Sequence, residues 1–419
     1  MSHIRIGPAS LWRNLDFLKL WIGQTISEVG SRITLVGLPV AAVLVLKATP
    51  FQMGLLAGMG GLASLLFGPI AGLWVDRMHR RPILIVSDLG RAALLGSIPL
   101  AAARGFLSMQ QIYVVVAIAG FLTVLFDVAY QSYLPSLVDR DHVMEGNSKL
   151  ALSSSIAEIA GPGLTGVLVQ LLTAPMAILF DALSFLGSAV TVWLIRKPEP
   201  AHDSGSADDL HNWEELTTGM RVLAQSPIRR AIAGHSATAG FFGGFFASLY
   251  VLFAIQTLHL SAALMGMVIA LGGVGNMIGA ALAPRLAQKW GVGGTLIGST
   301  LLMGTASIMI PLAHGSVVAA TAFLVVAQVG DICWPVFHVG ELSLRQIITP
   351  DRLLGRVNAA MQMLSRGLLP LGALCGGLLA EVVGVRPTLT VGAAGLLLSS
   401  LWLVFSPIRT MREYPSSTA

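Results

Sequence analysis

Long apolar runs, repeated along almost the whole chain and separated by short polar loops, constrain this sequence more than any other feature. Apolar residues make up 54% of the 419 residues and charged residues only 11%. A soluble protein of this composition has too few charges to cover its apolar surface, so an integral membrane protein is expected. Because a helical residue rises about 1.5 Å and the hydrocarbon core is about 30 Å thick, one span needs roughly 20 such residues.

Twelve runs satisfy that length. They lie at about 20–46, 52–75, 82–103, 110–134, 150–172, 175–195, 231–256, 264–287, 294–314, 316–340, 358–382 and 387–406. Helices satisfy their own backbone hydrogen bonds in lipid, and no run alternates as barrel strands do. The sequence therefore predicts an all-α membrane protein with twelve transmembrane helices.

Lysine and arginine are distributed unevenly between the loops. With the N-terminus in the cytoplasm, the inner segments hold twenty of the 26 basic residues and the outer segments three. The other three, Arg32, Arg91 and Arg366, fall within spans. Basic residues accumulate on the cytoplasmic side of membrane proteins, so both termini are predicted to be cytoplasmic. The first twenty residues are too polar for a cleaved signal peptide, and the first helix is expected to stay in the mature protein.

The longest polar segment divides the chain into three parts. We expect an N-terminal six-helix bundle over 1–195, a cytoplasmic linker over 196–229 and a C-terminal six-helix bundle over 230–419. The linker begins with a stretch rich in proline, serine and acid. It then carries apolar residues at helical spacing, which predict an amphipathic helix on the membrane surface. These residues are Trp213, Leu216, Met220 and Leu223. A simple tether and a regulatory element are both compatible with this pattern.

The two halves of the chain repeat each other. Residues 60–77 align without a gap on residues 272–289, a shift of 212, and two adjacent glycines coincide. Asp76 aligns on Gln288, so the second copy lacks this acid. Parallel six-helix repeats of this kind indicate two pseudo-symmetric bundles.

A tight basic loop separates the second and third apolar runs. It reads Gly72-Leu-Trp-Val-Asp76-Arg77-Met-His79-Arg80-Arg81. These residues resemble the loop 2–3 motif of major facilitator superfamily transporters, with His79 where glycine is usual. A second stretch resembles the glycine–proline motif on helix 5 of exporters and antiporters in that superfamily. It comprises Gly161, Pro162, Gly163 and Gly166.

Three further stretches resemble the branch that contains enterobactin exporters and macrolide-efflux proteins. They are Leu134-Pro135-x-Leu137-Val138 with Asn147, Asp181-Ala182-Leu183-Ser184-Phe185, and the long run from Ser343 to Asn358. The resemblance covers nearly the whole chain. It implies the major facilitator fold, and export of a small amphipathic compound by alternating access coupled to proton entry. We also expect a monomer in the inner membrane of a bacterium, in contact with lipid.

The charged residues of the basic loop can bind groups elsewhere in the protein or in the membrane. Asp76 can lie near the N-terminus of helix 11, where exposed amides favour an anion. Arg77, Arg80 and Arg81 can pair with acids such as Asp139 or with lipid headgroups. We expect these contacts to form a conformational latch, and further members of the network are Gly72, Asp88 and Arg91. Topogenic charge alone would explain the arginines but not Asp76.

Ionisable residues inside spans are the next signal, since a charge at the bilayer centre costs at least ~2.5–3.5 kcal/mol. Glu28 and Arg32 are four residues apart and can neutralise each other. Asp127 and Asp331 have no cation within their own helix, so with Glu28 they are candidates for proton binding. Helix 4 has Asp127 but lacks the arginine that proton-coupled drug antiporters often carry. A structural hydrogen-bonding role for these acids is equally compatible.

Aromatic residues cluster on two predicted helices beside glycine and proline. Such clusters can form a plastic apolar cavity for a bulky substrate, or simply pack between helices and against lipid. With Arg32, the cavity candidates are Phe241, Phe245, Tyr250, Trp334 and Phe337.

Enzymatic functions find little support in the sequence. It contains no phosphate-binding loop, no metal-ligand spacing and no nucleophile beside a base, so we expect no enzyme, cofactor or metal. The two cysteines, Cys333 and Cys375, lie in apolar runs and indicate no disulfide framework. The basic residues form no single patch, so nucleic acid is not an expected partner. A non-transporting receptor or assembly partner on a transporter scaffold, and an importer of the same fold, are the alternatives to an exporter.

Overall fold

The computed structural model describes residues 11–197, 199 and 212–414. They form two compact units. Unit 1 comprises residues up to 38 together with 66–206, and unit 2 comprises 39–65 together with 207–419. The end of the first long helix and the start of the second thus cluster with the C-terminal half of the chain, although the expected halves were contiguous.

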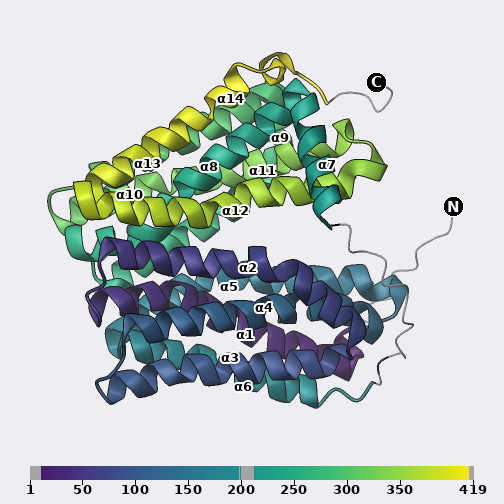
Figure 1. The fold of residues 1–419 in the computed structure, drawn as a ribbon, viewed down its shortest axis with the longest axis vertical. Coiled ribbons are helices and arrows are strands. Elements are labelled where there is room, and N and C mark those ends of the chain that lie inside the picture. The colour runs from purple at the N-terminus through teal and green to yellow at the C-terminus, as the bar shows by residue number, and fades with distance from the viewer. Residues whose placement is uncertain (1–10, 198, 200–211, 415–419) are drawn as a thin grey trace. The chain divides into compact units, whose positions relative to one another are not determined.

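Unit 1 is built from long helices that run side by side (Figure 1). Its elements are η1 (Leu11–Arg13), α1 (Leu15–Leu44), α2 (Pro50–Arg77), α3 (Arg80–Ala103), α4 (Met109–Leu137), η2 (Arg140–His142), α5 (Val143–Leu171) and α6 (Ala174–Trp193), the ends of α1 and α2 excepted. Local sequence starts two of these helices: Ser108 and Thr173 each accept a hydrogen bond from an amide of the first turn. α3 packs along both α4 and α6, and Leu84, Tyr133 and Val192 are buried in the core there.

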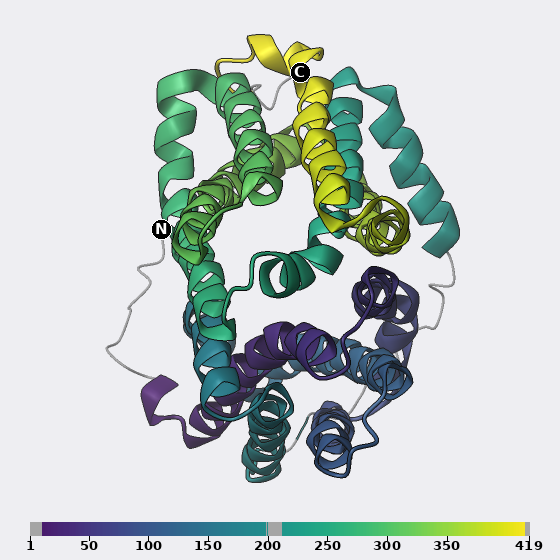
Figure 2. The same ribbon diagram turned by 90° about the vertical axis from the view of Figure 1, so that its left-hand side faces the viewer.

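Unit 2 combines short helices with a bundle of long ones (Figures 1 and 2). Its elements are α7 (Asn212–Gln225), α8 (Pro227–Leu252), a π-helical turn (Phe253–Thr257), α9 (Ala262–Leu312), α10 (Val317–Ala327), α11 (Val329–Ile348), α12 (Asp351–Val383), α13 (Val385–Ser399), α14 (Leu401–Val404) and η4 (Pro407–Thr410). α8 packs along α12, and α9 packs along α11.

Two predicted spans are joined without a loop. The runs expected at 264–287 and 294–314 form the single 51-residue element α9, which bends sharply at Gly291. The φ of Gly291 is 75° and its ψ is 165°, a conformation available essentially to glycine alone. One glycine therefore makes the whole turn. The run expected at 316–340 is instead divided into two helices, α10 and α11, which meet at Gln328.

The amphipathic helix of the linker packs on protein. Leu223 of α7 is 3% exposed and lies in the core of unit 2 with Val357 and Ala360 of α12. Gly219 lies so close to the carbonyl of Arg356 that any side chain would collide with it. At these residues the buried face of α7 is therefore covered by α12, and a membrane surface is not needed to cover it. Trp213 and Leu216 lie outside the residues whose side chains are described.

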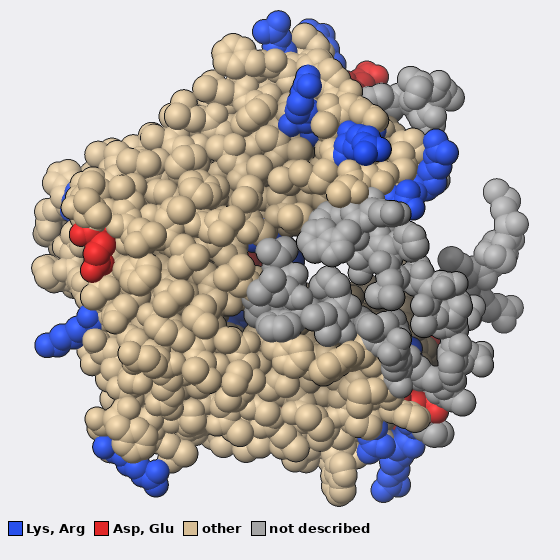
Figure 3. All heavy atoms as spheres, viewed as in Figure 1, with Lys and Arg blue, Asp and Glu red and all other residues tan. Residues whose placement is uncertain are grey.

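Ten stretches within the described residues are long and apolar enough to cross a membrane, α9 being counted once. Large apolar side chains such as Val318, Val382 and Phe405 are about four-fifths exposed, at 80%, 84% and 79%. Figure 3 shows a broad uncharged surface along the helices, with most charged side chains gathered at its borders. This pattern is typical of helices that face hydrocarbon.

Candidate functional site

An ion pair inside the first helix is the first polar feature of unit 1. Arg32 Nη2 lies 3.2 Å from Glu28 Oε1, one turn apart on α1. Ser154 on α5 donates to the same carboxylate oxygen at 3.1 Å. Both charged side chains are about one-third exposed, at 34% for Glu28 and 29% for Arg32. The pair is thus open enough to meet a ligand and close enough to neutralise itself.

Asp127 lies near this pair. Its carboxylate on α4 is solvent-accessible, and within the described part of the chain it makes no hydrogen bond or ion pair. It is in electrostatic range of Arg91 on α3 and of Glu28 on α1. Tyr130, one turn further along α4, is in electrostatic range of both Glu28 and Asp127. Sequence inspection found no cation for Asp127 because Arg91 belongs to another helix.

A second ion pair in unit 1 is fully buried. Asp88 is 0% exposed and accepts a hydrogen bond from Arg91, which is 4% exposed. The Arg91 guanidinium lies between the rings of Phe126 and Phe185, 4.3 Å and 4.1 Å from their centroids. These contacts lie on α4 and α6. The structure thus places the Asp88–Arg91 pair in the helix core, and its expected part in the loop network remains a prediction because the side chains of Asp76 and Arg77 are not described.

Two of the family-like stretches have packing roles in unit 1. Asp181 is 1% exposed and accepts a hydrogen bond from Ser184 at 3.1 Å. Gly161 faces the side-chain stem of Arg32 so closely that alanine would collide with it. α5 runs through the glycine–proline stretch without interruption. Gly161, the first residue of the stretch that also comprises Pro162, Gly163 and Gly166, thus permits close approach of α5 to Arg32 on α1.

Asp331 in unit 2 lies at a helix break. Its amide bonds to the carbonyl of Gln328 at 3.0 Å, and the Gln328 side chain donates to the Val268 carbonyl of α9 at 2.8 Å. The Asp331 carboxylate and the Gln328 amide both face Gly272, where no side chain would fit. Tyr250 on α8 is in electrostatic range of Asp331, and its buried hydroxyl has no partner among the described residues. The acid and the amide therefore meet beside Gly272, with the Tyr250 phenol in electrostatic range of the acid.

The aromatic candidates differ in their surroundings. Phe241 and Phe245 have centroids 5.7 Å apart, and Phe245 is 3% exposed against glycines of α12 and α13. Phe337 is 8% exposed and meets the buried His235 edge-on at 4.5 Å. Trp334 is 52% exposed and stacks on His338. Phe245 and Phe337 thus fill the interior of unit 2, while Trp334 remains accessible.

The basic loop after α2 is held by an acid that sequence inspection did not single out. The amides of Arg80 and Arg81, at the start of α3, donate to the two carboxylate oxygens of Glu199 at 2.9 Å and 2.6 Å. The Arg81 guanidinium donates to the carbonyls of residues 192 and 193 at the end of α6. The surroundings of Gly72 and of the Asp76 and Arg77 side chains are not described, so the latch role of these residues remains a prediction.

The equivalent turn in unit 2 is held by backbone. A shift of 212 takes residues 80 and 81 to Val292 and Gly293. Their amides donate to the carbonyls of Arg412 at 3.2 Å and Met411 at 2.9 Å. The first amides of a helix have no partner within the helix itself. In each unit, the segment after the last long helix thus supplies acceptors for the first amides of the third helix of the repeat.

Long apolar helices with charged residues in their interior define an integral membrane protein of the transporter class. Residues 20–371 match the sequence model of the Major Facilitator Superfamily. The chain belongs to this superfamily, and the relatives named below are transporters rather than enzymes.

Two relatives match almost end to end. The multidrug efflux pump Tap of Mycolicibacterium fortuitum is 24% identical over 417 residues, with 97% of each chain covered. The enterobactin exporter EntS of Citrobacter koseri is 25% identical over 417 residues, with 95% of this chain and 94% of the exporter covered. Macrolide efflux protein A of Streptococcus pyogenes is 26% identical over about half of each chain, 51% and 52%.

Solved structures share the fold. A bacterial homologue of the iron transporter ferroportin, in an inward-facing state, has a TM-score of 0.75 at 18% identity, covering 94% of this chain and 99% of that one. The nucleoside transporter NupG has a TM-score of 0.72 at 13% identity, covering 93% and 98%. At these identities the likeness establishes the fold and not the cargo.

Proposed function

We propose that the protein is a secondary active exporter that moves a small amphipathic compound, drug-like or siderophore-like, out of the cytoplasm in exchange for protons. The observation that carries this proposal is the end-to-end similarity to proteins named as a multidrug efflux pump and an enterobactin exporter. The fold supports the alternating-access part of this proposal, because transporters built from such repeats move one repeat against the other around a fixed binding site.

The polar cluster of unit 1 supports proton exchange. Charged residues inside spans are costly and therefore mark substrate and proton pathways. Glu28 and Arg32 are partly accessible, and Asp127 is accessible without a hydrogen bond in the described structure. An acid with those properties can take up a proton and release it again. We assign proton binding to Asp127 and Asp331, with the Glu28–Arg32 pair as a polar contact for the substrate.

The proposed topology has twelve helices, with both termini in the cytoplasm and the protein in a bacterial inner membrane. It counts the two arms of α9 as separate spans and adds α2, a 28-residue helix, to the stretches already described as long enough. The basic loop of residues 72–81 is proposed to be a latch, and the protein is proposed to act as a monomer in contact with lipid.

Transport of a radiolabelled macrolide into proteoliposomes tests the proposal. An acidic lumen should drive uptake, and a protonophore should abolish it. Asp127→Asn should reduce gradient-driven uptake at least ten-fold, since the amide cannot carry the proton, and Asp331→Asn tests the second candidate. Glu413→Gln, an exposed acid in unit 2, is the matched control and should transport normally.

Other outcomes identify the alternatives. Uptake that ignores the gradient, with both variants normal, would contradict proton exchange. Uptake driven by an alkaline lumen would indicate an importer, in which substrate and proton move together. Saturable binding without transport would indicate a receptor on a transporter scaffold. Undiminished transport by Asp76→Asn would rule out the latch.

A further inference from the structure

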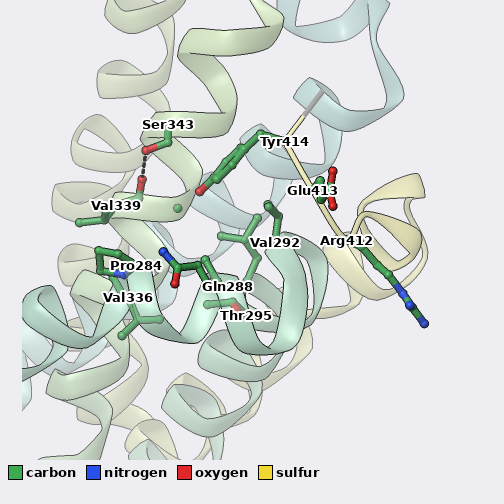
Figure 4. Close-up of a pocket in the computed structure, with 14 residues that line it drawn as sticks. Pro284, Gln288, Val292, Thr295, Val336, Val339, Ser343, Arg412, Glu413 and Tyr414 are labelled. Atoms are coloured by element: carbon green, nitrogen blue, oxygen red, sulfur yellow. Dashed lines mark hydrogen bonds between the residues drawn. The ribbon is translucent and has the colours of Figure 1, made fainter. Parts of the chain in front are cut away.

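A cavity of about 560 Å³ lies within unit 2, and none of the candidates for proton or substrate binding is among the residues that line it. The two arms of α9, α11 and the segment after η4 surround it, and Figure 4 shows the residues that line it. The lining is mainly apolar, with Val292 and Leu296 from the second arm of α9 and Val336 and Val339 from α11. A cavity of this size is typical of sites for drug-sized molecules.

The bend at Gly291 creates the cavity, and the C-terminal segment closes one side of it. The bend separates the arm that carries Gln288 from the arm that carries Thr295. Backbone hydrogen bonds from residues 292 and 293 hold residues 411 and 412 against the bend. Figure 4 shows the Tyr414 ring reaching inward from this segment, while the Arg412 side chain points away.

Thr295 supplies a buried polar group that has no partner in the part of the chain that the structure describes. Its side chain lines the cavity, the residue is 4% exposed, and its hydroxyl makes no hydrogen bond within the described residues. A helical threonine usually bonds to the carbonyl four residues earlier. For Thr295 that residue is Gly291, whose backbone leaves the helical conformation. Ser343 does donate to the carbonyl four residues earlier, at 2.8 Å, and Ser299 donates to the carbonyl three residues earlier, at 3.0 Å.

The cavity therefore combines an apolar body with a hydroxyl that lacks a partner. Leaving such a group unsatisfied is costly, so a ligand that bonds to it gains the interaction at little desolvation cost. The Gln288 amide also faces the cavity and has no hydrogen bond in the described structure. The only charged residues of the lining, Arg412 and Glu413, have opposite signs. This environment selects against a strongly charged ligand.

We propose that this cavity binds a neutral amphipathic molecule of drug size, whose hydrogen-bonding group contacts Thr295 and Gln288. Such a molecule can come from the bilayer, as a diacylglycerol does, or from solution, as a small aromatic alcohol does. The site lies within one unit and does not use Glu28, Asp127 or Asp331. The aromatic candidates for substrate binding are also absent from its lining, so the proposal stands whether or not the protein exchanges its substrate for protons.

Photolabelling of the full-length protein in lipid nanodiscs tests the proposal, with 4-benzoylbenzyl alcohol as the probe. We expect saturable labelling that peptide mapping places within residues 283–296 or 336–343. Excess dioctanoylglycerol should suppress the label if the natural ligand comes from the bilayer, and excess benzhydrol alone should suppress it if the ligand comes from solution. Labelling that neither competitor reduces would overturn the site.

Two variants and a control separate binding from folding. Val339→Phe fills the cavity and should abolish the label, whereas Val382→Phe, at an 84% exposed position on α12, should leave it unchanged. Thr295→Val keeps the shape and removes the hydroxyl, so the protein should fold normally and half-saturation should need about five-fold more probe. Equal labelling of all variants, or labelling spread evenly over exposed peptides, would also overturn the site.

Discussion

The helix α3 and the second arm of α9 occupy the same place in the two repeats, yet they are held in different ways. The first amides of α3 bind the Glu199 carboxylate, while those of the α9 arm bind backbone carbonyls of residues 411 and 412. α3 also carries the buried Asp88–Arg91 pair. The same shift of 212 takes that pair to Thr300 and Met303, which carry no charge.

The same position in the two repeats can therefore be stabilised by a charged side chain or by backbone hydrogen bonds alone. A carboxylate at a helix N-terminus is stabilised by the helix dipole and by the charge-assisted hydrogen bonds it accepts. Backbone carbonyls make weaker bonds, but they need no side chain and do not respond to salt or to protonation. The first repeat is therefore the half whose stability should depend on ionic conditions.

The largest effect is expected from breaking the buried pair of α3. Arg91→Met should destabilise the protein by about 3–5 kcal/mol, because it leaves Asp88 buried without its cation. The double variant Asp88→Thr/Arg91→Met copies the uncharged second repeat and should regain most of that loss. Apparent melting temperatures in detergent measure both. A double variant as unstable as Arg91→Met would show that the two repeats are not interchangeable at this position.

The next largest effect concerns the turn itself. Gly291→Ala should cost about 1–3 kcal/mol, because a side chain is strained at a φ of 75° and would also crowd Arg412. The position equivalent to Gly291 in the first repeat is His79, whose φ of −62° and ψ of 133° suit any residue. His79→Ala should therefore leave the melting temperature almost unchanged. Equal losses in the two variants would contradict this account of the turns.

The features of the two repeats that depend on residues close together in the sequence could be predicted from it. The apolar runs predicted most helices within a few residues, and the aligned glycines of the two repeats predicted that residues 60–77 and 272–289 are equivalent. The four-residue spacing of Glu28 and Arg32 predicted their ion pair, because such residues share one face of a helix. Periodicity and spacing carry this information without knowledge of the fold.

Contacts between distant residues could not be predicted in the same way. Glu199 lies 118 residues from Arg81, in a stretch that the sequence marks as linker. Arg91, which is in electrostatic range of Asp127, belongs to another helix. The helices that carry the aromatic candidates are apolar on most sides, so hydrophobicity alone did not indicate which rings face the interior. The absence of a loop at Gly291 depends on one backbone conformation, which composition does not specify.

The smallest expected effect would sharpen the contrast between the two ways of holding a helix. Glu199→Gln retains one carbonyl oxygen for the amides of Arg80 and Arg81 but loses the second acceptor and the charge. We expect a loss of about 1–2 kcal/mol at low salt, measured as a shift in the apparent melting temperature. The matched variant is Glu413→Gln, which changes an exposed acid in the C-terminal segment of unit 2 and leaves the carbonyls of residues 411 and 412 in place. It should have no measurable effect.

Salt concentration separates the two mechanisms further. Raising it from low to about 1 M shortens the Debye length to roughly 3 Å, so the charge of Glu199 should contribute less to stability. The difference in apparent melting temperature between wild type and Glu199→Gln should then narrow. The hydrogen bonds of the second repeat carry no net charge, and a variant truncated after Thr410, which removes both carbonyl acceptors, should remain equally destabilised at low and high salt. If salt instead narrowed the truncation's deficit and left that of Glu199→Gln unchanged, the assignment of charge to one repeat and backbone to the other would be reversed.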